Sequence, residues 1–556
     1  MSDYTAHIDT FTKDHLPPRK LWPEFRFELP ELQYPDRVNC GRVLLDDAIA
    51  EGHAARTVLY SDAGSWTYAE LFEQTNRIAN VLVLDLGVVP GNRVLLRAPN
   101  TPMLAACWLA VMKAGAVAVT TMPMLRAKEL AVIVQKARIE HALCDARLVD
   151  ELRQVAIAAG LRHIVTFSDG NEDSADGGSE LESLMGRRDS HFDAVDTARD
   201  DVCLLAFTSG TTGQPKATMH FHRDVLAMRD VVARHVFETS SSDIYVGSPP
   251  LGFTFGLGAL LVFPLASRGV VALVEQPTPE NLLDAVQKFG ATALFTAPTA
   301  YRNLVPLAPQ YDLSSLRRCI SAGEPLPKAT SDAWCKATGI RIIDGIGATE
   351  MIHIFISASG AEIRPGATGK PLPGYQACVL DEEGRALPRG FAGRLAVKGP
   401  TGCRYLDDPR QAEYVQGGWN VTGDRYFVDT DGYFWFEARA DDMIISGGYN
   451  IAGPEVEAAL ITHPAVKECA VVGSPDDARG QIVKAFVVLN AGFIGDPALV
   501  GSLQSLVKQA IAPYKYPRAV EFVAALPKTR TGKVQRNVLR LRELDNASSV
   551  MLDREL

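Results

Sequence analysis

The sequence lacks the cysteine patterns of a disulfide framework or a structural zinc site. Its nine cysteines are scattered over 556 residues and form no C-x-x-C pair. This distribution is typical of reduced thiols in a cytoplasmic protein and argues against a small disulfide-stabilised scaffold. Between Met1 and Lys20 there is also no apolar signal-peptide region. We therefore expect a cytoplasmic protein.

An excess of positive charge is missing as well. The formal net charge is -10 at pH 7, with 56 Lys and Arg against 66 Asp and Glu. Because nucleic acid backbones demand a basic surface, this balance argues against nucleic acid as a partner. The chain is also longer than one hydrophobic core usually serves, so we expect at least two domains.

One stretch without charge could be mistaken for a membrane span. Ile244 to Ser267 carries no charged side chain, but prolines and glycines that break or weaken a helix interrupt it. These residues are Pro249, Pro250, Pro264, Gly247, Gly252, Gly256 and Gly258. We interpret the stretch as buried core beside a pocket, and expect no membrane partner.

Apolar strand-like runs alternate with helix-like segments through the first three-quarters of the chain. Arg93–Ala98 reads as a strand, and Thr101 and Pro102 supply an N-cap and a first-turn proline for a helix to about Ala114. Further strands are expected at 116–120, 202–207, 270–274 and 291–295, with helices near 220–237 and 279–288. This order predicts an α/β fold in which helices cover parallel-rich sheets.

The pattern changes after about residue 440. Short helices are expected at 454–461 and 500–511, and strands at 469–472 and 485–489. Together they predict a compact α+β unit large enough to fold alone. We therefore divide the chain into a large N-terminal domain, 1–440, and a small C-terminal domain, 441–556.

The densest polar motif is the run Thr208-Ser209-Gly210-Thr211-Thr212-Gly213-Gln214-Pro215-Lys216, which follows an apolar strand and precedes a helix. Glycines let backbone N–H groups approach phosphate oxygens, hydroxyls donate hydrogen bonds, and the lysine neutralises charge. The spacing of a Walker A loop is absent. The run therefore predicts a polyphosphate site of another kind, with a plain polar turn as the alternative.

This run resembles the phosphate-binding signature of the adenylate-forming superfamily, which comprises acyl-CoA synthetases, peptide-synthetase adenylation domains and firefly luciferase. Four further motifs follow in that family's order: Asp344–Glu350 (D-G-I-G-A-T-E), Trp419–Asp424 (W-N-V-T-G-D), Arg439–Asp442 with Ser446–Ile451, and Pro527–Lys533. The resemblance spans about 40 to 540. It implies an enzyme that uses ATP to activate a carboxylate as an acyl-AMP and transfers the acyl group to a thiol.

The resemblance also implies a role for each matching residue. Lys533 reaches the α-phosphate region and the carboxylate, Glu350 holds Mg²⁺, and Thr349 donates to the phosphate. Asp424 accepts hydrogen bonds from the ribose hydroxyls, with Arg439 beside it. The other implied nucleotide-binding residues are Thr208, Ser209, Gly210, Thr211, Thr212, Gly213, Lys216 and Gly347. One departure is Ile346, where many relatives have tyrosine, so stacking on adenine is not assured there.

The C-terminal domain is implied to be mobile. In the family it rotates between the half-reactions about the position of Asp441, first delivering the lysine and then a glycine-rich face for thioester formation. That face would be Gly447, Gly448 and Tyr449, where glycines permit close approach of the CoA arm. ATP, Mg²⁺ and CoA are therefore the implied cofactor and co-substrates.

The acyl pocket is expected between the charge-free stretch and the second nucleotide motif. Its candidate lining is Phe253, Thr254, Phe255, Gly323 and His353. Aromatic rings suit a flat aryl acid, and the histidine can donate to a ring substituent or to the carboxylate. The alternative is a core histidine with partners of its own. The runs 343–355 and 321–327 resemble benzoate- and 2-aminobenzoate-CoA ligases, which implies one of these acids as substrate.

Other functions remain open at this point. A stand-alone adenylation enzyme would load an aryl acid onto a carrier protein, and the sequence shows no fused carrier domain. A luciferase-type oxygenase shares the resemblance, although its chemistry depends on a substrate that sequence does not reveal. A non-catalytic nucleotide-binding protein would be expected to lack Lys533 or Glu350, and both are present. A homodimer is suggested by analogy alone.

His220 and His222 raise the question of a metal site. At i and i+2 on a helix they would face different ways, and no third ligand is near them in sequence. We therefore expect no metal there.

Overall fold

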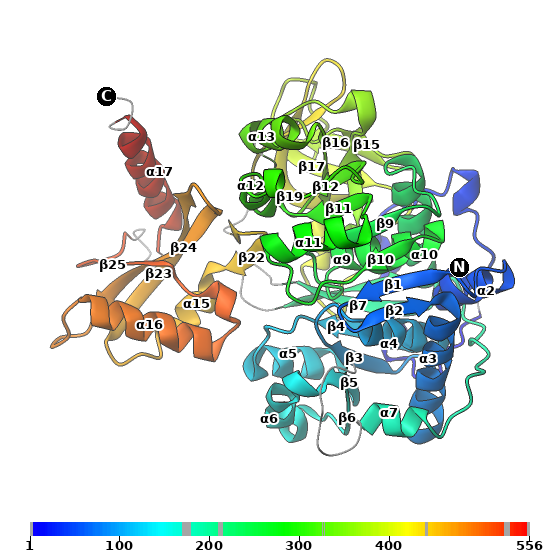
Figure 1. Cartoon of the computed structure of the whole chain (residues 1–556). Helices are drawn as coiled ribbons and strands as arrows, with labels where there is room; N and C mark the ends of the chain where they lie inside the picture. The colour runs from blue at the N-terminus through cyan, green and yellow to red at the C-terminus, as the bar shows by residue number, and fades with distance from the viewer. Residues whose placement is uncertain are drawn as a thin grey trace. The chain divides into compact units, whose positions relative to one another are not determined.

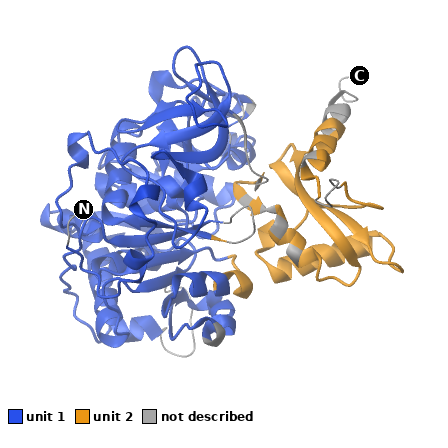
Figure 2. Cartoon of the chain, turned by 180° about the vertical axis from the view of Figure 1, so that it is seen from behind, with its two compact units in different colours: residues 1–123, 131–208, 216–438 blue, residues 124–130, 209–215, 439–556 orange. Residues whose placement is uncertain are grey.

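The computed structural model describes residues 4–168, 180–208, 215–324, 326, 328–439, 443–527 and 534–552. The chain forms two compact units, which Figure 2 distinguishes by colour. The larger unit comprises 1–123, 131–208 and 216–438, and the smaller unit comprises 124–130, 209–215 and 439–556. The domain boundary at 440/441 stays a prediction, because residues 440–442 lie outside the described residues.

A six-stranded sheet in the larger unit has the order β6-β5-β3-β4-β7-β8 (Figure 1). Its neighbours pair in parallel, except that β8 runs antiparallel to β7. The strands predicted near 93, 116 and 202 are confirmed as β3, β4 and β7. The bounds are β3 Arg93–Arg97, β4 Val117–Thr121, β5 His141–Asp145, β6 His163–Phe167, β7 Val202–Thr208 and β8 Lys216–Phe221.

A nine-stranded sheet of the same unit has the order β15-β14-β13-β12-β11-β9-β10-β1-β2. Its strands from β13 to β1 pair in parallel, and β2, β14 and β15 pair antiparallel at the edges. The bounds are β1 Thr57–Ser61, β2 Gly64–Thr67, β9 Ile244–Gly247, β10 Val270–Ala272, β11 Ala293–Thr296, β12 Arg318–Ser321, β13 Ile342–Gly347, β14 Ile354–Ser357 and β15 Lys370–Pro371.

Helices cover these sheets, as the alternation in the sequence predicted. The most buried is α4, which is enclosed along its whole length and begins at Pro102 with Thr101 as its N-cap. One hydrophobic core joins residues of α4 and of both sheets. The longer helices of the unit are α3 Tyr68–Asn80, α4 Pro102–Lys113, α5 Ala127–Ala137, α6 Val149–Ala159, α7 Glu180–Met185, α8 His222–Met228, α11 Pro279–Phe289, α12 Pro298–Leu304 and α13 Lys328–Thr338.

The charge-free stretch is buried, as expected, but half of it is helical. The chain from Thr254 to Ser267 forms α9 (Thr254–Leu257), a π-helical turn (Gly258–Val262) and α10 (Phe263–Ser267). The prediction that glycines and Pro264 break a helix there was wrong. Pro264 is tolerated at the start of α10, and tertiary burial outweighs the low helix propensity of glycine. Among the described residues, no helix is long and apolar enough to cross a membrane.

A smaller antiparallel sheet completes the larger unit, with the order β16-β17-β19-β18 and β20 paired to β19. Its bounds are β16 Gln376–Leu380, β17 Gly393–Lys398, β18 Val415–Gln416, β19 Trp419–Val428 and β20 Phe434–Arg439, with the short helix α14 at Gln411–Tyr414.

The smaller unit has its own core around a sheet of order β22-β21-β24-β23, with β25 beside β24. The predicted helices and strands are confirmed, although β23 and β24 are longer than expected. The bounds are β21 Met443–Ser446, β22 Tyr449–Ala452, α15 Gly453–Leu460, β23 Val466–Asp476, β24 Gly480–Leu489, α16 Pro497–Ala510, β25 Ala519–Phe522 and α17 Arg536–Leu552.

Candidate nucleotide and acyl site

Lys216 lies at the start of a strand that the sequence analysis missed. We expected a helix soon after the phosphate motif, but the chain returns as β8 with Lys216 opposite Thr208, and the helix begins only at His222. Nearly all of β8 is buried on both faces. Its sequence, K-A-T-M-H-F, nevertheless alternates polar and apolar residues, and this period of two was a signal that could have predicted the strand.

The hairpin brings Lys216 to Glu350, an acid 134 residues away in sequence. The ammonium nitrogen lies 3.4 Å from Oε1 of Glu350. The hydroxyl of Thr208, across the hairpin, has no hydrogen-bond partner among the described residues. The structure thus joins the first and second nucleotide motifs through an ion pair.

Tyr405 completes this group, and the sequence analysis did not single it out. Its hydroxyl donates to Oε1 of Glu350 and accepts a hydrogen bond from Lys216 at 2.9 Å. A bridge between Thr218 and Tyr405 and the bond from the Leu406 amide to the Ala217 carbonyl hold this segment against β8. No local motif marks the tyrosine, because its role depends on a pairing between distant segments.

The Glu350 carboxylate is ionised although it is buried. Burial by itself would raise its pKa, but the Lys216 ammonium and the Tyr405 hydroxyl outweigh burial and lower the pKa below its ordinary value. The side chain is only 9% exposed. An ionised carboxylate is the kind of hard oxygen ligand that Mg²⁺ takes, so the residue fits the predicted metal role.

Thr349 and Glu350 lie in a one-turn 3₁₀ helix, Thr349–Met351, that other elements hold from outside. The Thr349 carbonyl accepts a hydrogen bond from Nε2 of His220 at 2.8 Å, and the Met351 carbonyl accepts one from Thr401 at 2.8 Å. The following residue, Ile352, has φ 64° and ψ -33°. This is a left-handed conformation that β-branched residues rarely adopt, so packing and hydrogen bonds must hold the turn.

Asp344, in the same motif, is a second unusual acid. Burial raises its pKa to about 7, against smaller opposite effects of the Gly345 amide and the Ser321 hydroxyl. Its Oδ1 has no hydrogen-bond partner among the described residues. A buried polar atom without a partner is rare and marks a position where a bound group can supply the partner.

The acyl-pocket prediction falls on described residues, and the structure brings its two central members together. The His353 ring lies 5.7 Å from Phe255 and 4.9 Å from Phe263, measured between ring centroids. Burial lowers the pKa of His353 to about 3, which the nearby Phe255 carbonyl offsets only in part, so the ring is neutral. Neither ring nitrogen makes a hydrogen bond of normal geometry with the described residues. The role of His353 in the acyl pocket stays a prediction.

The other predicted pocket residues hold different positions. Thr254 is buried in α9, and Phe253 is the residue before that helix. Gly323 is exposed after β12 with φ 91°, a conformation that favours glycine. Gly258 was not predicted, yet a Cβ there would lie 2.6 Å from the His353 ring. Only a glycine at this position leaves room for the imidazole.

The remaining nucleotide and CoA predictions divide between the units. Asp424 is buried in β19, and Gly347 ends β13, where a Cβ would lie 2.9 Å from the backbone of His353. Gly447 and Gly448 form the positive-φ turn between β21 and β22, and the Tyr449 ring stacks on Tyr514 at 4.3 Å. Predictions outside the described residues are Ser209, Gly210, Thr211, Thr212, Gly213, Asp441, Lys533 and the side chain of Arg439.

Comparison with known proteins gives a consistent picture. The family model described as AMP-binding enzyme matches residues 46–404, and the model of the AMP-binding enzyme C-terminal domain matches residues 455–533. The chain belongs to the AMP-binding enzyme family. This is the adenylate-forming superfamily that the motifs predicted, and the predicted fold class is confirmed with it.

Three relatives are informative. The benzoate–CoA ligase of Thauera aromatica is 35% identical over 92% of this chain and 97% of its own length. The anthranilate CoA ligase AuaEII, solved with anthranoyl-AMP, is 34% identical, with TM-score 0.71 over 93% of this chain and 100% of its own. The amide bond synthetase McbA from Marinactinospora thermotolerans is 29% identical, with TM-score 0.80 over 91% of this chain and 99% of its own. With its ligase relatives, the chain is an acid–thiol ligase of the AMP-binding type.

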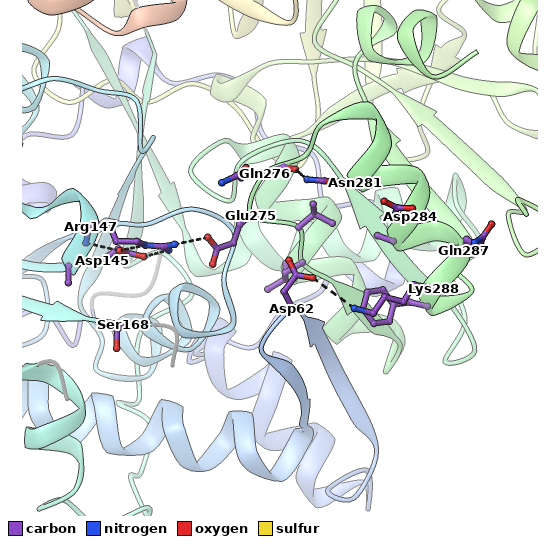
Figure 3. A pocket seen from close by; sticks show the side chains of 15 residues that line it. Asp62, Asp145, Arg147, Ser168, Glu275, Gln276, Asn281, Asp284, Gln287 and Lys288 are labelled. Atoms are coloured by element: carbon purple, nitrogen blue, oxygen red, sulfur yellow. Dashed lines mark hydrogen bonds and ion pairs between the residues drawn. The ribbon is translucent and has the colours of Figure 1, made fainter. Parts of the chain in front are cut away.

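A cavity of about 600 Å³ in the larger unit lies apart from the predicted site residues, none of which line it (Figure 3). It is bordered by the ends of β5 and β10 and by α11, and Arg147 is already paired with Asp145 at 2.6 Å and Glu275 at 3.0 Å. Its carboxylates outnumber its cations. This charge disfavours a polyphosphate ligand.

Among the described residues, one group of potential metal ligands comes together: Cys40, Cys203 and His222, with ligand atoms within 4.8 Å of one another. Distance in sequence had hidden the two cysteines from the sequence analysis. However, Nδ1 of His222 accepts the Cys40 amide hydrogen at 3.1 Å, so its lone pair is engaged. We interpret the group as a hydrogen-bonded part of the core. His220 lies in β8 and not on the helix that we expected, and the two histidines contact different segments: the Thr349 carbonyl for His220 and the Cys40 amide for His222.

Proposed function

We propose that the protein is an ATP-dependent, AMP-forming aryl acid–CoA ligase whose acid is an aromatic carboxylate, with 2-aminobenzoate or benzoate the best candidates. The observation that carries the aryl assignment is His353, a buried neutral imidazole set against Phe255 and Phe263 with no hydrogen-bond partner of normal geometry among the described residues. Aromatic walls suit a flat ring, and a neutral imidazole can donate to or accept from a ring substituent without burying a charge.

The nucleotide side of the proposal rests on Lys216, Glu350 and Thr349. A carboxylate becomes a good electrophile when one of its oxygens attacks the α-phosphorus of ATP and pyrophosphate leaves, which yields an acyl-AMP. Lys216 would neutralise charge on the phosphates, and the hydroxyls of the phosphate motif would donate hydrogen bonds to them. Asp424 would accept hydrogen bonds from the ribose hydroxyls. Lys533 is proposed to neutralise charge at the α-phosphate.

Glu350 is the proposed Mg²⁺ ligand. Mg²⁺, when bound, neutralises negative charge on the phosphate oxygens. In this structure Lys216 and the Tyr405 hydroxyl share Oε1 of Glu350, and Oε2 would remain for the metal.

The second half-reaction is proposed to use the glycine turn of the smaller unit. The CoA thiolate attacks the acyl carbon of the acyl-AMP, and AMP leaves with the bonding electrons. Gly447 and Gly448 have positive φ and carry no side chain, so the backbone there offers a surface for the pantetheine arm. Asp441 remains the proposed hinge of the rotation between the two half-reactions.

The acid and the acceptor can be tested in one assay. Purified protein is incubated with ATP and Mg²⁺, and with benzoate, 2-aminobenzoate, acetate or octanoate, in the presence of CoA or of an amine, and products are identified by mass spectrometry. An aryl-CoA with release of pyrophosphate supports the proposal. Acyl-AMP without thioester would favour a carrier-loading enzyme, and an amide product would favour the chemistry that McbA's name states. Turnover of acetate or octanoate alone would overturn the aryl assignment.

A further inference from the structure

We propose that His220 is a positioning residue that holds the turn carrying Thr349 and Glu350 through a single hydrogen bond to the Thr349 carbonyl. The Nε2 atom of His220 lies 2.8 Å from that oxygen, and the histidine is fully buried. A carbonyl oxygen only accepts hydrogen bonds, so Nε2 carries the hydrogen. The bond fastens β8, which begins with Lys216, to the turn that contains Glu350.

A buried carboxylate lies beside the imidazole. Nδ1 of His220 lies 3.7 Å from Oδ2 of Asp224, which is beyond hydrogen-bond distance, and it has no hydrogen-bond partner among the described residues. Burial would raise the pKa of Asp224, but the Arg404 guanidinium, with His220 and Arg223, outweighs burial and lowers it, so the carboxylate is ionised. Asp224 also accepts the Phe221 amide at 3.0 Å, which fixes it at the start of α8.

The turn needs an external support because its own backbone is strained. The Thr349 carbonyl accepts the amide of Ile352 at 3.1 Å as well as His220, and Ile352 has φ 64°. A β-branched residue in this region costs free energy unless its surroundings hold it there. Without the His220 bond the turn can relax, and the Glu350 carboxylate and the Thr349 hydroxyl lose their fixed places. This inference rests on the proposed roles of Glu350 and Thr349 in binding ATP.

The test compares two substitutions of His220 that differ only in the bond. His220→Gln can place an amide N–H near the position of Nε2, whereas His220→Leu fills the space without a donor. ATP binding with Mg²⁺ is measured by calorimetry, and kcat and KM for acyl-AMP formation are measured separately. One lost hydrogen bond corresponds to about a three- to tenfold change. We expect His220→Leu to weaken ATP binding by about tenfold and to lower kcat, with KM for the acid unchanged, and His220→Gln to recover most of the loss.

His222→Leu is the matched control, because His222 is equally buried two residues away and contacts Cys40 instead of the turn. It should leave the affinity for ATP unchanged, even where it lowers the thermal midpoint. Equal losses in His220→Leu and His220→Gln at matched thermal midpoints would overturn the inference, as would normal ATP binding in both. If the wild-type protein binds no ATP, the proposed function fails instead.

Discussion

The hydroxyl of Tyr405 donates a hydrogen bond to the carboxylate of Glu350, so the proposed metal-binding acid is held by a residue that no sequence motif had marked. Lys216 binds the same two groups, at 2.9 Å and 3.4 Å. Two residues from separate segments, Lys216 and Tyr405, thus keep one buried carboxylate ionised. The protonation state of that carboxylate therefore depends on these neighbours.

Removing this hydroxyl should change how activity depends on pH. Tyr405→Phe deletes a donor to Glu350, so the pKa of the carboxyl rises and the ionised form is lost at a higher pH as the solution is acidified. We expect the acidic limb of the profile of kcat/KM for ATP to move to higher pH. Tyr245→Phe is the control, because that buried hydroxyl contacts Ser267 instead. An unmoved limb, or one at lower pH, would contradict the prediction.

A methyl group at Gly258 should disturb the acyl pocket. The Cβ of Gly258→Ala would lie 2.6 Å from the His353 ring and 3.0 Å from Phe263, so the imidazole must move. We expect kcat/KM for the aryl acid to fall by about tenfold or more, the loss that 1.4 kcal/mol of transition-state stabilisation gives. Gly501→Ala is the control, since a Cβ on that helix position meets nothing within 4 Å. Unchanged kcat/KM in Gly258→Ala would contradict the proposal that His353 lines the acyl pocket.

Asp344 should make the protein less stable as the pH rises. Its pKa is about 7 in the folded state against the ordinary value of 3.8, so between these pH values the folded chain keeps a proton that the unfolded chain releases. Stability then falls with pH, by at most about 1.4 kcal/mol per pH unit, and the loss is complete above pH 7. Asp344→Asn cannot ionise.

Thermal midpoints of wild type and Asp344→Asn at pH 5, 6, 7 and 8 test this. The thermal midpoint of Asp344→Asn should rise relative to that of the wild type between pH 5 and pH 8. Parallel curves would show that the acid is not buried as the structure has it.

The buried pair Arg404–Asp224 should be costly to break. Both side chains are fully buried, and Arg404 also donates to the Met219 carbonyl. Arg404→Met leaves the Asp224 carboxylate without its main counter-charge, which typically costs about 3–5 kcal/mol. Urea unfolding should show a clearly lower midpoint. Arg385→Met, which breaks an exposed pair with Asp381, should leave the midpoint unchanged.

The sequence was most informative where local chemistry repeats a known pattern. Thr101 and Pro102 predicted where α4 begins, because capping depends on neighbouring residues only. The phosphate motif, the D-G-I-G-A-T-E motif and the aromatic acyl segment identified the family and predicted Glu350 and His353 as site residues. These signals are local, so they can be read without the fold.

Tertiary structure decided the rest, because burial and distant pairing leave no local signature. The pairing of β8 with β7 depends on the hairpin between them, and the sequence analysis expected only a helix from about residue 220. The helix across Gly258 and Pro264 formed where propensity opposed it, because packing outweighs propensity inside a core. Tyr405, His220 and Asp344 gained their roles only when the fold brought Lys216 to Glu350 and excluded water around them.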